Sequence, residues 1–315
     1  MRHLGTLLGW SLLAMTAVGG PPKITSVPIT GFEPSATVMR RDPSDIIRVG
    51  DRYYLWYTKG QVHHGYDSTI WYATSADGLA WEEQGEALPR GPEGAWDAQS
   101  VFTPNILVAE NRYWLFYTAV PKPFTNDGNK VTKSAIGTAV SDSPDGPWTK
   151  LDTNPILRTS DDPAQFDSMR VDDTVLLVRE GRYWLYYKGR QWDRSWNETK
   201  LGVAIADQPQ GPYVKHEKNP VVPAGHEVMV WPVGDSVMAM INIGAKPYAK
   251  SLQVATDGVT FKKSRDLGRV PHAAGFYLPE ADTDSGKGQP PEWGIEIIEA
   301  PKCLPNLGRF NCKWQ

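Results

Sequence analysis

Arg52–Thr58 read RYYLWYT, Arg112–Thr118 read RYWLFYT, and Arg182–Lys188 read RYWLYYK. One seven-residue phrase therefore occurs three times, and its copies start 60 and 70 residues apart. Each copy follows an apolar stretch and a two-residue turn; the turns are Gly50-Asp51, Glu110-Asn111 and Glu180-Gly181. An apolar strand, a tight turn and an aromatic strand together predict a β-hairpin.

Two further strand patterns follow each hairpin, separated by turns that contain Asp-Gly or Gln-Gly. Four antiparallel strands that recur every 60 to 70 residues are typical of a β-propeller blade. A weaker fourth copy begins at His226-Glu227, and the stretches GFYLPEA and EWGIEIIEA supply strands for a fifth blade. Residues 23–32 (KITSVPITGF) can complete that blade and close the ring, which would leave no exposed strand edge between blades. The prediction is an all-β, five-bladed β-propeller.

The N-terminal residues have the layout of a secretory signal. Arg2 and His3 precede an apolar run from Leu4 to Val18, and small residues follow. We therefore expect residues 1–21 to be a signal peptide and residues 22–315 to form one domain in the periplasm or outside the cell. No later stretch approaches membrane-spanning length. The formal net charge of −3, without a Lys/Arg cluster, argues against a nucleic-acid partner.

The two cysteines, Cys303 and Cys312, both lie near the C-terminus. In an exported chain such a pair predicts a disulfide, which would close a short loop in the tail. Two free thiols are the alternative.

The hairpin phrase also aligns one blade with another. Without gaps, Asp42 of the first blade corresponds to Asp172 of the third and to His226 of the fourth, which Glu227 follows. These residues precede the inner strands, which meet at one mouth of a propeller's central channel. We therefore expect their side chains to converge there.

Acidic residues before a strand can simply form turns. Several acids at one level of a channel are electrostatically costly, however, unless they take part in chemistry. Glycoside hydrolysis needs a carboxylate base, a proton donor with a raised pKa and often a third group that tunes the donor. The pattern therefore indicates a glycosidase site at this mouth.

Other side chains near these positions could bind a sugar through stacking or hydrogen bonds. Packing between blades and ion pairs at blade edges are the alternative interpretations. The candidate substrate-binding residues are Trp96, Gln99, Ser100, Thr103, Arg170, Lys188 and Arg190. Trp192, Trp196 and Trp231 also lie in loops or at strand ends, and His63-His64 could reach the mouth from a solvent-exposed loop.

The ordered motifs resemble those of the five-bladed glycoside hydrolases of family 43, and most of all those of family 117. They are RDPSDI from Arg41, FTPNI from Phe102, DDTVLL from Asp172 and GHEVMVWP from Gly225. The resemblance implies an exo-acting α-1,3-(3,6-anhydro-L-galactosidase), which trims neoagaro-oligosaccharides such as neoagarobiose from agar.

The resemblance also implies roles for individual residues. Asp42 would be the general base that activates water, so that the reaction inverts the anomeric centre. The proton donor would come from the His226-Glu227 pair. Asp172 would tune the pKa of the donor, and Asp167 and Asp173 are rivals for that role by their spacing.

The resemblance implies an oligosaccharide substrate and no required cofactor. Family members can hold a divalent metal near the site, but no set of metal ligands is identifiable in this sequence. A homodimer is also open, although family members exchange a helical N-terminal extension for which this chain has little room.

Three other functions remain open at this point. The first is an arabinofuranosidase or xylosidase of the family 43 kind. The second is a carbohydrate-binding propeller without catalysis, which needs aromatic residues but no acid trio. The third is a scaffold for protein partners, in which the acids only form turns.

Overall fold

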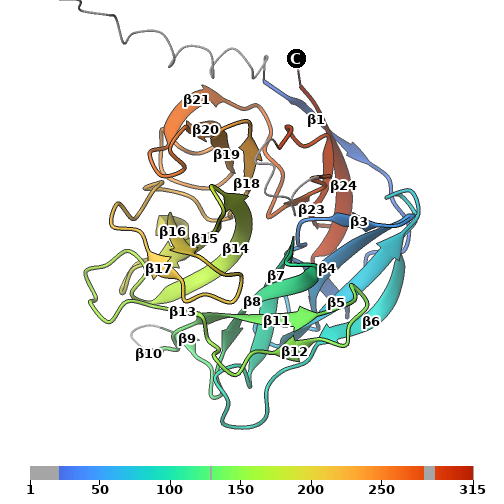
Figure 1. The fold of residues 1–315 in the computed structure, drawn as a ribbon. Helices are drawn as coiled ribbons and strands as arrows, with labels where there is room; N and C mark the ends of the chain where they lie inside the picture. Colours follow the sequence, from blue (N-terminus) through green and yellow to red (C-terminus); the bar gives the residue numbers. More distant parts are fainter. Residues whose placement is uncertain (1–20, 128–129, 280–287, 315) are drawn as a thin grey trace, which may run out of the picture.

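A computed structural model describes residues 21–127, 130–279 and 288–314 (Figure 1). Within these ranges, five antiparallel sheets are arranged around a central axis as the blades of a β-propeller, which confirms the predicted fold. Residues 1–20 of the expected signal peptide lie outside the described ranges. In the described part of the chain, no helix is long and apolar enough to cross a membrane.

Blades 1 to 4 follow one another along the chain. Blade 1 contains β2 (Met39–Arg41), β3 (Ile47–Val49), β4 (Arg52–Gly60), β5 (Ser68–Ser75) and β6 (Glu82–Leu88). Blade 2 contains β7 (Ser100–Ala109), β8 (Arg112–Val120), β11 (Ala135–Ser141) and β12 (Thr149–Lys150), with β13 (Leu157–Arg158) paired to β11. Blade 3 contains β14 (Arg170–Arg179), β15 (Arg182–Arg190), β16 (Lys200–Ala206) and β17 (Val214–Lys215). Blade 4 contains β18 (Val230–Val233), β19 (Ser236–Ile241), β20 (Ser251–Ala255) and β21 (Lys262–Asp266).

Blade 5 joins the two ends of the described chain. It contains β22 (Gly275–Phe276), β23 (Trp293–Ile298), β24 (Asn306–Lys313) and, as its outermost strand, β1 (Lys23–Val27). Outside the blades, β9 (Asn126–Asp127) pairs with β10 (Lys130–Val131), and η1 (Trp196–Glu198) is a short 3₁₀ helix.

The repeated phrase forms the second strand of blades 1, 2 and 3, namely β4, β8 and β15. The central residues of each copy are fully buried; they are Leu55–Tyr57, Leu115–Tyr117 and Leu185–Tyr187. Trp56, for example, packs in one cluster with Val101 and Ile106 of the neighbouring blade. Full burial of a large apolar side chain stabilises a fold by about 1.5–3 kcal/mol. The phrase therefore holds adjacent blades together.

The ring closes through both the outer and the inner strands of blade 5. β1 pairs with β24 from Lys23↔Lys313 to Val27↔Arg309, which confirms that the N-terminal segment completes the blade. At the inner end, the Ile46 N–H donates to the Phe276 carbonyl at 2.8 Å, and the Phe276 N–H donates to Asp45 Oδ1 at 2.8 Å. These contacts join blade 1 to blade 5.

The predicted disulfide is wrong, because the C-terminal residues form a strand instead of a loop. Cys303 and Cys312 are both free thiols. Cys312 lies near the far end of β24, where it pairs with Ile24 of β1. An extended strand advances about 3.3 Å per residue, so β24 carries Cys312 out of disulfide range of the turn that contains Cys303.

The two thiols should differ in reactivity. Cys303 is partly exposed, whereas Cys312 is buried, and burial raises the pKa of its thiol to about 12. We expect a thiol reagent to label Cys303 in the native protein at neutral pH and to label both cysteines after unfolding in urea without a reductant. A count of labelled sites by mass spectrometry checks this. If neither cysteine were labelled in the unfolded chain, the two cysteines would form the predicted disulfide after all.

Candidate active site

The inner edges of blades 1, 2, 3 and 5 break at one corresponding position. Asp42, Thr103, Asp173 and Ala273 have φ values of 50°, 46°, 48° and 43°. Such left-handed backbone is uncommon for residues other than glycine. Pairing is interrupted between Phe102 and Asn105 in β7, and the register shifts around Asp173 in β14.

Threonine hydroxyls from the preceding blade hold two of these breaks. The Thr103 N–H donates to Thr58 Oγ1 at 2.9 Å, and the Asp173 N–H donates to Thr118 Oγ1 at 3.3 Å. Thr58 and Thr118 are the last residues of the first two copies of the repeated phrase, and Lys188 takes their place in the third. We did not predict a role for either threonine. The replacement of Thr by Lys at the seventh position of the third copy could have indicated that this position differs in function between blades.

The structure shifts the predicted blade alignment by one residue. Strand pairing sets Arg41 opposite Thr58 and Asp172 opposite Lys188, so Asp42 corresponds to Asp173 and not to Asp172. The ungapped alignment is wrong because blade 1 has one more residue than blade 3 between this position and its hairpin, in the segment that contains Ser44.

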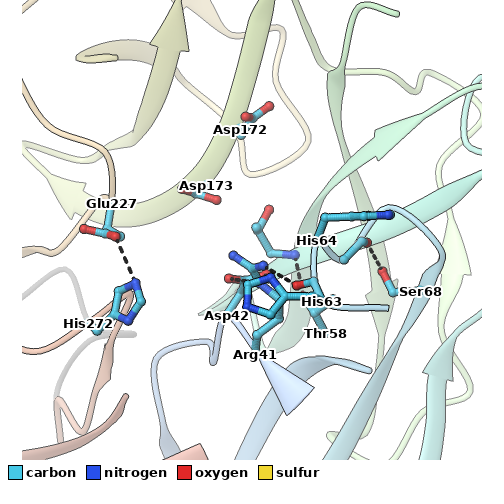
Figure 2. Close-up of polar contacts among 12 residues, drawn as sticks. Arg41, Asp42, Thr58, His63, His64, Ser68, Asp172, Asp173, Glu227 and His272 are labelled. Carbon is cyan, nitrogen blue, oxygen red and sulfur yellow. Dashed lines mark hydrogen bonds and ion pairs between the residues drawn. The ribbon is translucent and has the colours of Figure 1, made fainter. Parts of the chain in front are cut away.

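Each blade contributes two consecutive residues to one pocket of about 460 Å³. The first of each pair forms what we call the outer ring: Arg41, Phe102, Asp172, His226 and His272. The second forms the inner ring: Asp42, Thr103, Asp173, Glu227 and Ala273. The inner ring also lines a smaller cavity of about 40 Å³ within the channel, so it forms the floor of the pocket. Figure 2 shows Asp42, Asp173 and Glu227 approaching this region from three different blades.

Arg41 orients the carboxylate of Asp42. Its Nε lies 3.0 Å from both carboxylate oxygens, and its guanidinium also donates to the His63 carbonyl at 3.0 Å (Figure 2). The charge of Asp42 raises the pKa of Arg41 above its usual value. His63 and His64 line the pocket and are also exposed to solvent.

Lys188 binds the two carboxylates of blade 3. Its Nζ lies 2.6 Å from Asp173 Oδ2 and 3.7 Å from Asp172 Oδ2, while Ser134 Oγ donates to Asp172 Oδ1 at 2.8 Å. Burial raises the pKa of Asp173 to about 6, against the opposing effect of Lys188, and the charges of Asp172 and Asp42 add to the rise. The carboxyl group of Asp173 therefore ionises at a pH of about 6.

Glu227 is the buried carboxyl group that blade 4 contributes to the inner ring. Its side chain is buried, and burial raises its pKa to about 7; Asp173 and Asp42 raise it further, while Lys188 lowers it. Among the described residues, its nearest charged or polar partner is His272, whose Nε2 lies 3.5 Å from Oε1 (Figure 2). Burial lowers the pKa of His272, so this contact provides little positive charge at neutral pH.

His226 stays neutral in this environment. Burial lowers its pKa to about 2, and the charge of Lys188 acts in the same direction. Its Nδ1 lies 3.2 Å from Thr199 Oγ1, and its ring packs edge-on against Trp196, with ring centroids 5.2 Å apart. The His226-Glu227 pair therefore has its dissociable proton on Glu227 near neutral pH.

The predicted substrate-binding residues separate into two groups. Thr103, Lys188 and Arg190 line the pocket, together with Trp196, which is 56 % exposed. The other predicted residues, Trp96, Gln99, Ser100 and Arg170, are not part of its lining, and Trp192 and Trp231 are not either.

Some residues outside the lining support Tyr66, which does line the pocket. Gln99 donates to the Tyr66 carbonyl at 3.1 Å, and the guanidinium of Arg170 lies 5.6 Å from the centre of the Tyr66 ring. Ser100 is buried against Ser68, with their hydroxyl oxygens 2.9 Å apart. Trp96 stacks on Tyr117 instead and lines a separate groove.

Asp167 belongs to a repeated element of blade structure. Its Oδ2 lies 2.6 Å from Lys215 Nζ and accepts a hydrogen bond from the Tyr187 hydroxyl at 2.8 Å. Asp97 has the same position in blade 2, with Oδ2 2.6 Å from Lys150 Nζ. Asp167 does not line the pocket. The arrangement thus argues for a structural role and against the predicted catalytic one.

The family resemblance raised the question of a divalent metal. Across residues 21–127, 130–279 and 288–314, no group of three or more His, Cys, Asp or Glu side chains is arranged to hold a metal ion. The side chains that are described therefore do not fit such a metal.

The matched aspartates allow a direct test of the role of Asp167. Both Asp97→Asn and Asp167→Asn remove one member of a buried ion pair, so we expect each to lower the free energy of unfolding by about 1.5–3 kcal/mol. Urea denaturation of the two variants checks this. If Asp167 belonged to the crowded carboxylates of the pocket, Asp167→Asn would instead leave stability unchanged or raise it, and only Asp97→Asn would destabilise.

Comparison with known proteins identifies the family. A family model described as glycosyl hydrolases family 43 matches residues 33–178. Comparison with the curated proteins finds no match. Among solved structures, the protein resembles an endo-arabinase from Bacteroides thetaiotaomicron (17% identity, TM-score 0.55, 90% of this protein and 97% of that one). It also resembles an α-L-arabinofuranosidase from Lactobacillus brevis (12% identity, TM-score 0.56, 90% and 94%). Identities this low show the fold alone.

A third structure is a much nearer relative. Zg3597, a family 117 glycoside hydrolase produced by the marine bacterium Zobellia galactanivorans, is 30% identical, with a TM-score of 0.80. The match covers 92% of this protein and 90% of that one. Because it extends over nearly the full length of both proteins, and because the pocket has three carboxyl groups on its floor, the chain belongs to glycoside hydrolase family 117.

Proposed function

We propose that the protein is an exo-acting, inverting glycoside hydrolase that releases 3,6-anhydro-L-galactose from the non-reducing end of neoagaro-oligosaccharides. The observation that carries the proposal is the pocket floor, where Asp42, Asp173 and Glu227 meet in one ring. Membership of family 117 supports the choice of sugar.

The closed floor supports attack at a chain end. The pocket of about 460 Å³ is within the usual range for small-ligand sites. The cavity of about 40 Å³ behind the floor is far too small for a sugar ring. A polysaccharide therefore cannot pass through the channel, so the substrate has to enter from the mouth of the pocket.

The environments of the carboxyl groups support different roles. Asp42, whose carboxyl group is bound by Arg41, is the general base that takes a proton from the attacking water. Glu227 holds the proton that the glycosidic oxygen receives, either directly or through the neighbouring imidazole of His226. Asp173, which raises the pKa of Glu227, takes the tuning role that the sequence had suggested for Asp172.

One observation favours a second candidate. The family 43 model matches residues 33–178, which include Asp42 and Asp173. An arabinofuranosidase or xylosidase would use the same base and acid with a different sugar in the pocket. The choice between these substrates has to be made by assay.

We also propose that the chain is exported and that residues 1–21 are its signal peptide. The basic start and the apolar run from Leu4 to Val18 support this. N-terminal sequencing of protein from the periplasm or medium tests it, and a mature protein that still begins at Met1 would contradict it.

Replacement of the base should abolish turnover. We expect Asp42→Asn to lower kcat on neoagarobiose by about 10²–10⁴-fold, because general base catalysis contributes that much, while substrate binding persists. Asp51→Asn, in the exposed hairpin turn of the same blade, is the matched control and should retain activity. Assays should also include aryl arabinofuranoside and xyloside, with the anomer of the product identified by NMR. Hydrolysis of the pentosides alone would refute the proposed substrate.

The pH profile should report the proton on Glu227. Because this carboxyl must be protonated to act as an acid and has a pKa of about 7, kcat/KM should fall as the pH rises above 7. Glu227→Gln should remove this limb and most activity on neoagarobiose. It should spare substrates whose aryl leaving group needs no proton. An unchanged alkaline limb in Glu227→Gln would exclude Glu227 as the donor.

His226→Gln distinguishes the two routes for the proton. If the imidazole relays the proton, this variant loses activity on the natural substrate as strongly as Glu227→Gln does. If Glu227 donates directly, His226→Gln keeps the alkaline limb.

A further inference from the structure

Three of the residues that line the small cavity behind the pocket floor each have a buried polar atom without a hydrogen-bond partner in the described part of the chain. Asn105 Oδ1, Thr174 Oγ1 and Glu227 Oε2 have no hydrogen-bond partner among the described residues. All three residues line the cavity of about 40 Å³, and they are only 3 %, 4 % and 5 % exposed. Buried polar atoms in native proteins are nearly always satisfied, so a shared partner in this cavity is the simplest explanation for all three.

The other polar atom of two of these side chains is already engaged. Asn105 Nδ2 donates to Asp45 Oδ2 at 3.3 Å, and Asp45 in turn accepts the Phe276 N–H across the ring closure. This contact leaves Asn105 Oδ1 as an acceptor without a partner among the described residues. Glu227 Oε1 faces His272 at 3.5 Å, which leaves Oε2. Contacts with Asp45 of blade 1 and His272 of blade 5 thus hold Asn105 and Glu227, two of the residues that line the cavity.

The size of the cavity and the chemistry of the three atoms suit water. One water needs about 10–15 Å³ of such space and typically makes about three hydrogen bonds in a protein interior. A water here can accept from the Thr174 hydroxyl and donate one proton to Asn105 Oδ1 and the other to Glu227 Oε2. All three atoms are then satisfied when Glu227 is ionised.

We propose that Asn105 and Thr174 hold a water beneath the floor of the pocket, and that this water positions Glu227 and stabilises its carboxylate as the proton leaves. The inference rests on the proposed role of Glu227 as the proton donor. Asn105 and Thr174 are positioning residues, because they act through the water and do not face the pocket above.

The proton balance of the reaction explains the use of such a water. Glu227 gives its proton to the glycosidic oxygen as the bond to the anomeric carbon breaks, while Asp42 takes a proton from the attacking water. A negative charge then develops on Glu227 in a buried place. The groups that act electrostatically on Glu227 are Lys188, Asp173, Asp42, Arg41 and the nearby His272. Neither Lys188 nor Arg41 forms an ion pair with Glu227 among the described contacts, so a hydrogen bond from the buried water would supply direct stabilisation.

Three variants of threonine test the proposal. Thr174→Val removes the hydroxyl that holds the water, and Thr174→Ser keeps it. Thr138→Val is the matched control, because Thr138 Oγ1 is also buried without a partner among the described residues but lies on β11, away from the cavity. Each variant is measured in a crystal structure at high resolution and in pH profiles of kcat/KM.

We expect density for a water in the parent and in Thr174→Ser, and its loss or displacement in Thr174→Val. Thr174→Val should raise the apparent pKa of Glu227 by about one to two units, since it weakens a hydrogen bond to the ionised form. Its kcat/KM should fall by about 10- to 100-fold on substrates with poor leaving groups, and far less on activated aryl glycosides. Thr174→Ser and Thr138→Val should keep the parent profile.

Other results would overturn the proposal. These are a parent cavity without density, a cation there with oxygen ligands at about 2.1–2.6 Å, or the same pH shift in Thr138→Val. The crystal structures test for the water without any substrate. Infrared difference spectra can likewise follow the carboxylic acid band of Glu227 without a substrate, with Glu227→Gln as the reference. Failure on neoagarobiose with success on a pentoside would therefore reject the proposed substrate and leave this inference intact.

Discussion

The break in the inner edges of blades 1, 2, 3 and 5 is the constraint on which the site depends. A continuous strand would send alternate side chains into the neighbouring blades and leave none pointing at the channel axis. At Asp42 and Asp173 the backbone instead adopts left-handed φ values, a conformation that costs about 1–3 kcal/mol for such residues. Hydrogen bonds from Thr103 to Thr58 and from Asp173 to Thr118 fix the breaks of blades 2 and 3 against the preceding blade.

The three carboxyl groups of the pocket floor differ in their cationic partners, and this difference gives them different tendencies to hold a proton. Asp42 has Arg41 and Asp173 has Lys188, each within 3.0 Å, whereas the nearest described partner of Glu227 is a histidine whose own pKa is lowered. Three acids in one ring cannot all ionise without a large Coulombic penalty. The proton therefore favours Glu227, which has no ion pair with Lys or Arg among the described residues. In the proposed mechanism, blade 4 accordingly supplies the acid and blade 1 supplies the base.

The sequence predicted the parts of the molecule that repeat. The aromatic phrase located β4, β8 and β15 because a buried strand between two blades requires the same large side chains each time. Measuring from it placed Asp172 and His226 level with Asp42, whereas Asp173 and Glu227 have that position in the structure. The error arose because the sequence alone does not show whether an extra residue lies in a bulge or in a turn. His272 was missed altogether, since blade 5 has no copy of the phrase and its place in the ring is visible only in three dimensions. The disulfide prediction failed because it assumed a loop at the C-terminus, whereas Asn306–Lys313 form β24.

The pairing of β1 with β24 has a consequence for the order of events in the cell. The partners Lys23 and Lys313 are separated by the four other blades along the chain, so blade 5 cannot be completed until the ribosome has made β24. Contacts between such distant residues form slowly. Until then β1 has no partner, and the growing chain remains an open row of blades. Such a chain reaches its final shape only after synthesis, which gives any machinery that handles unfolded chains a long interval in which to engage it.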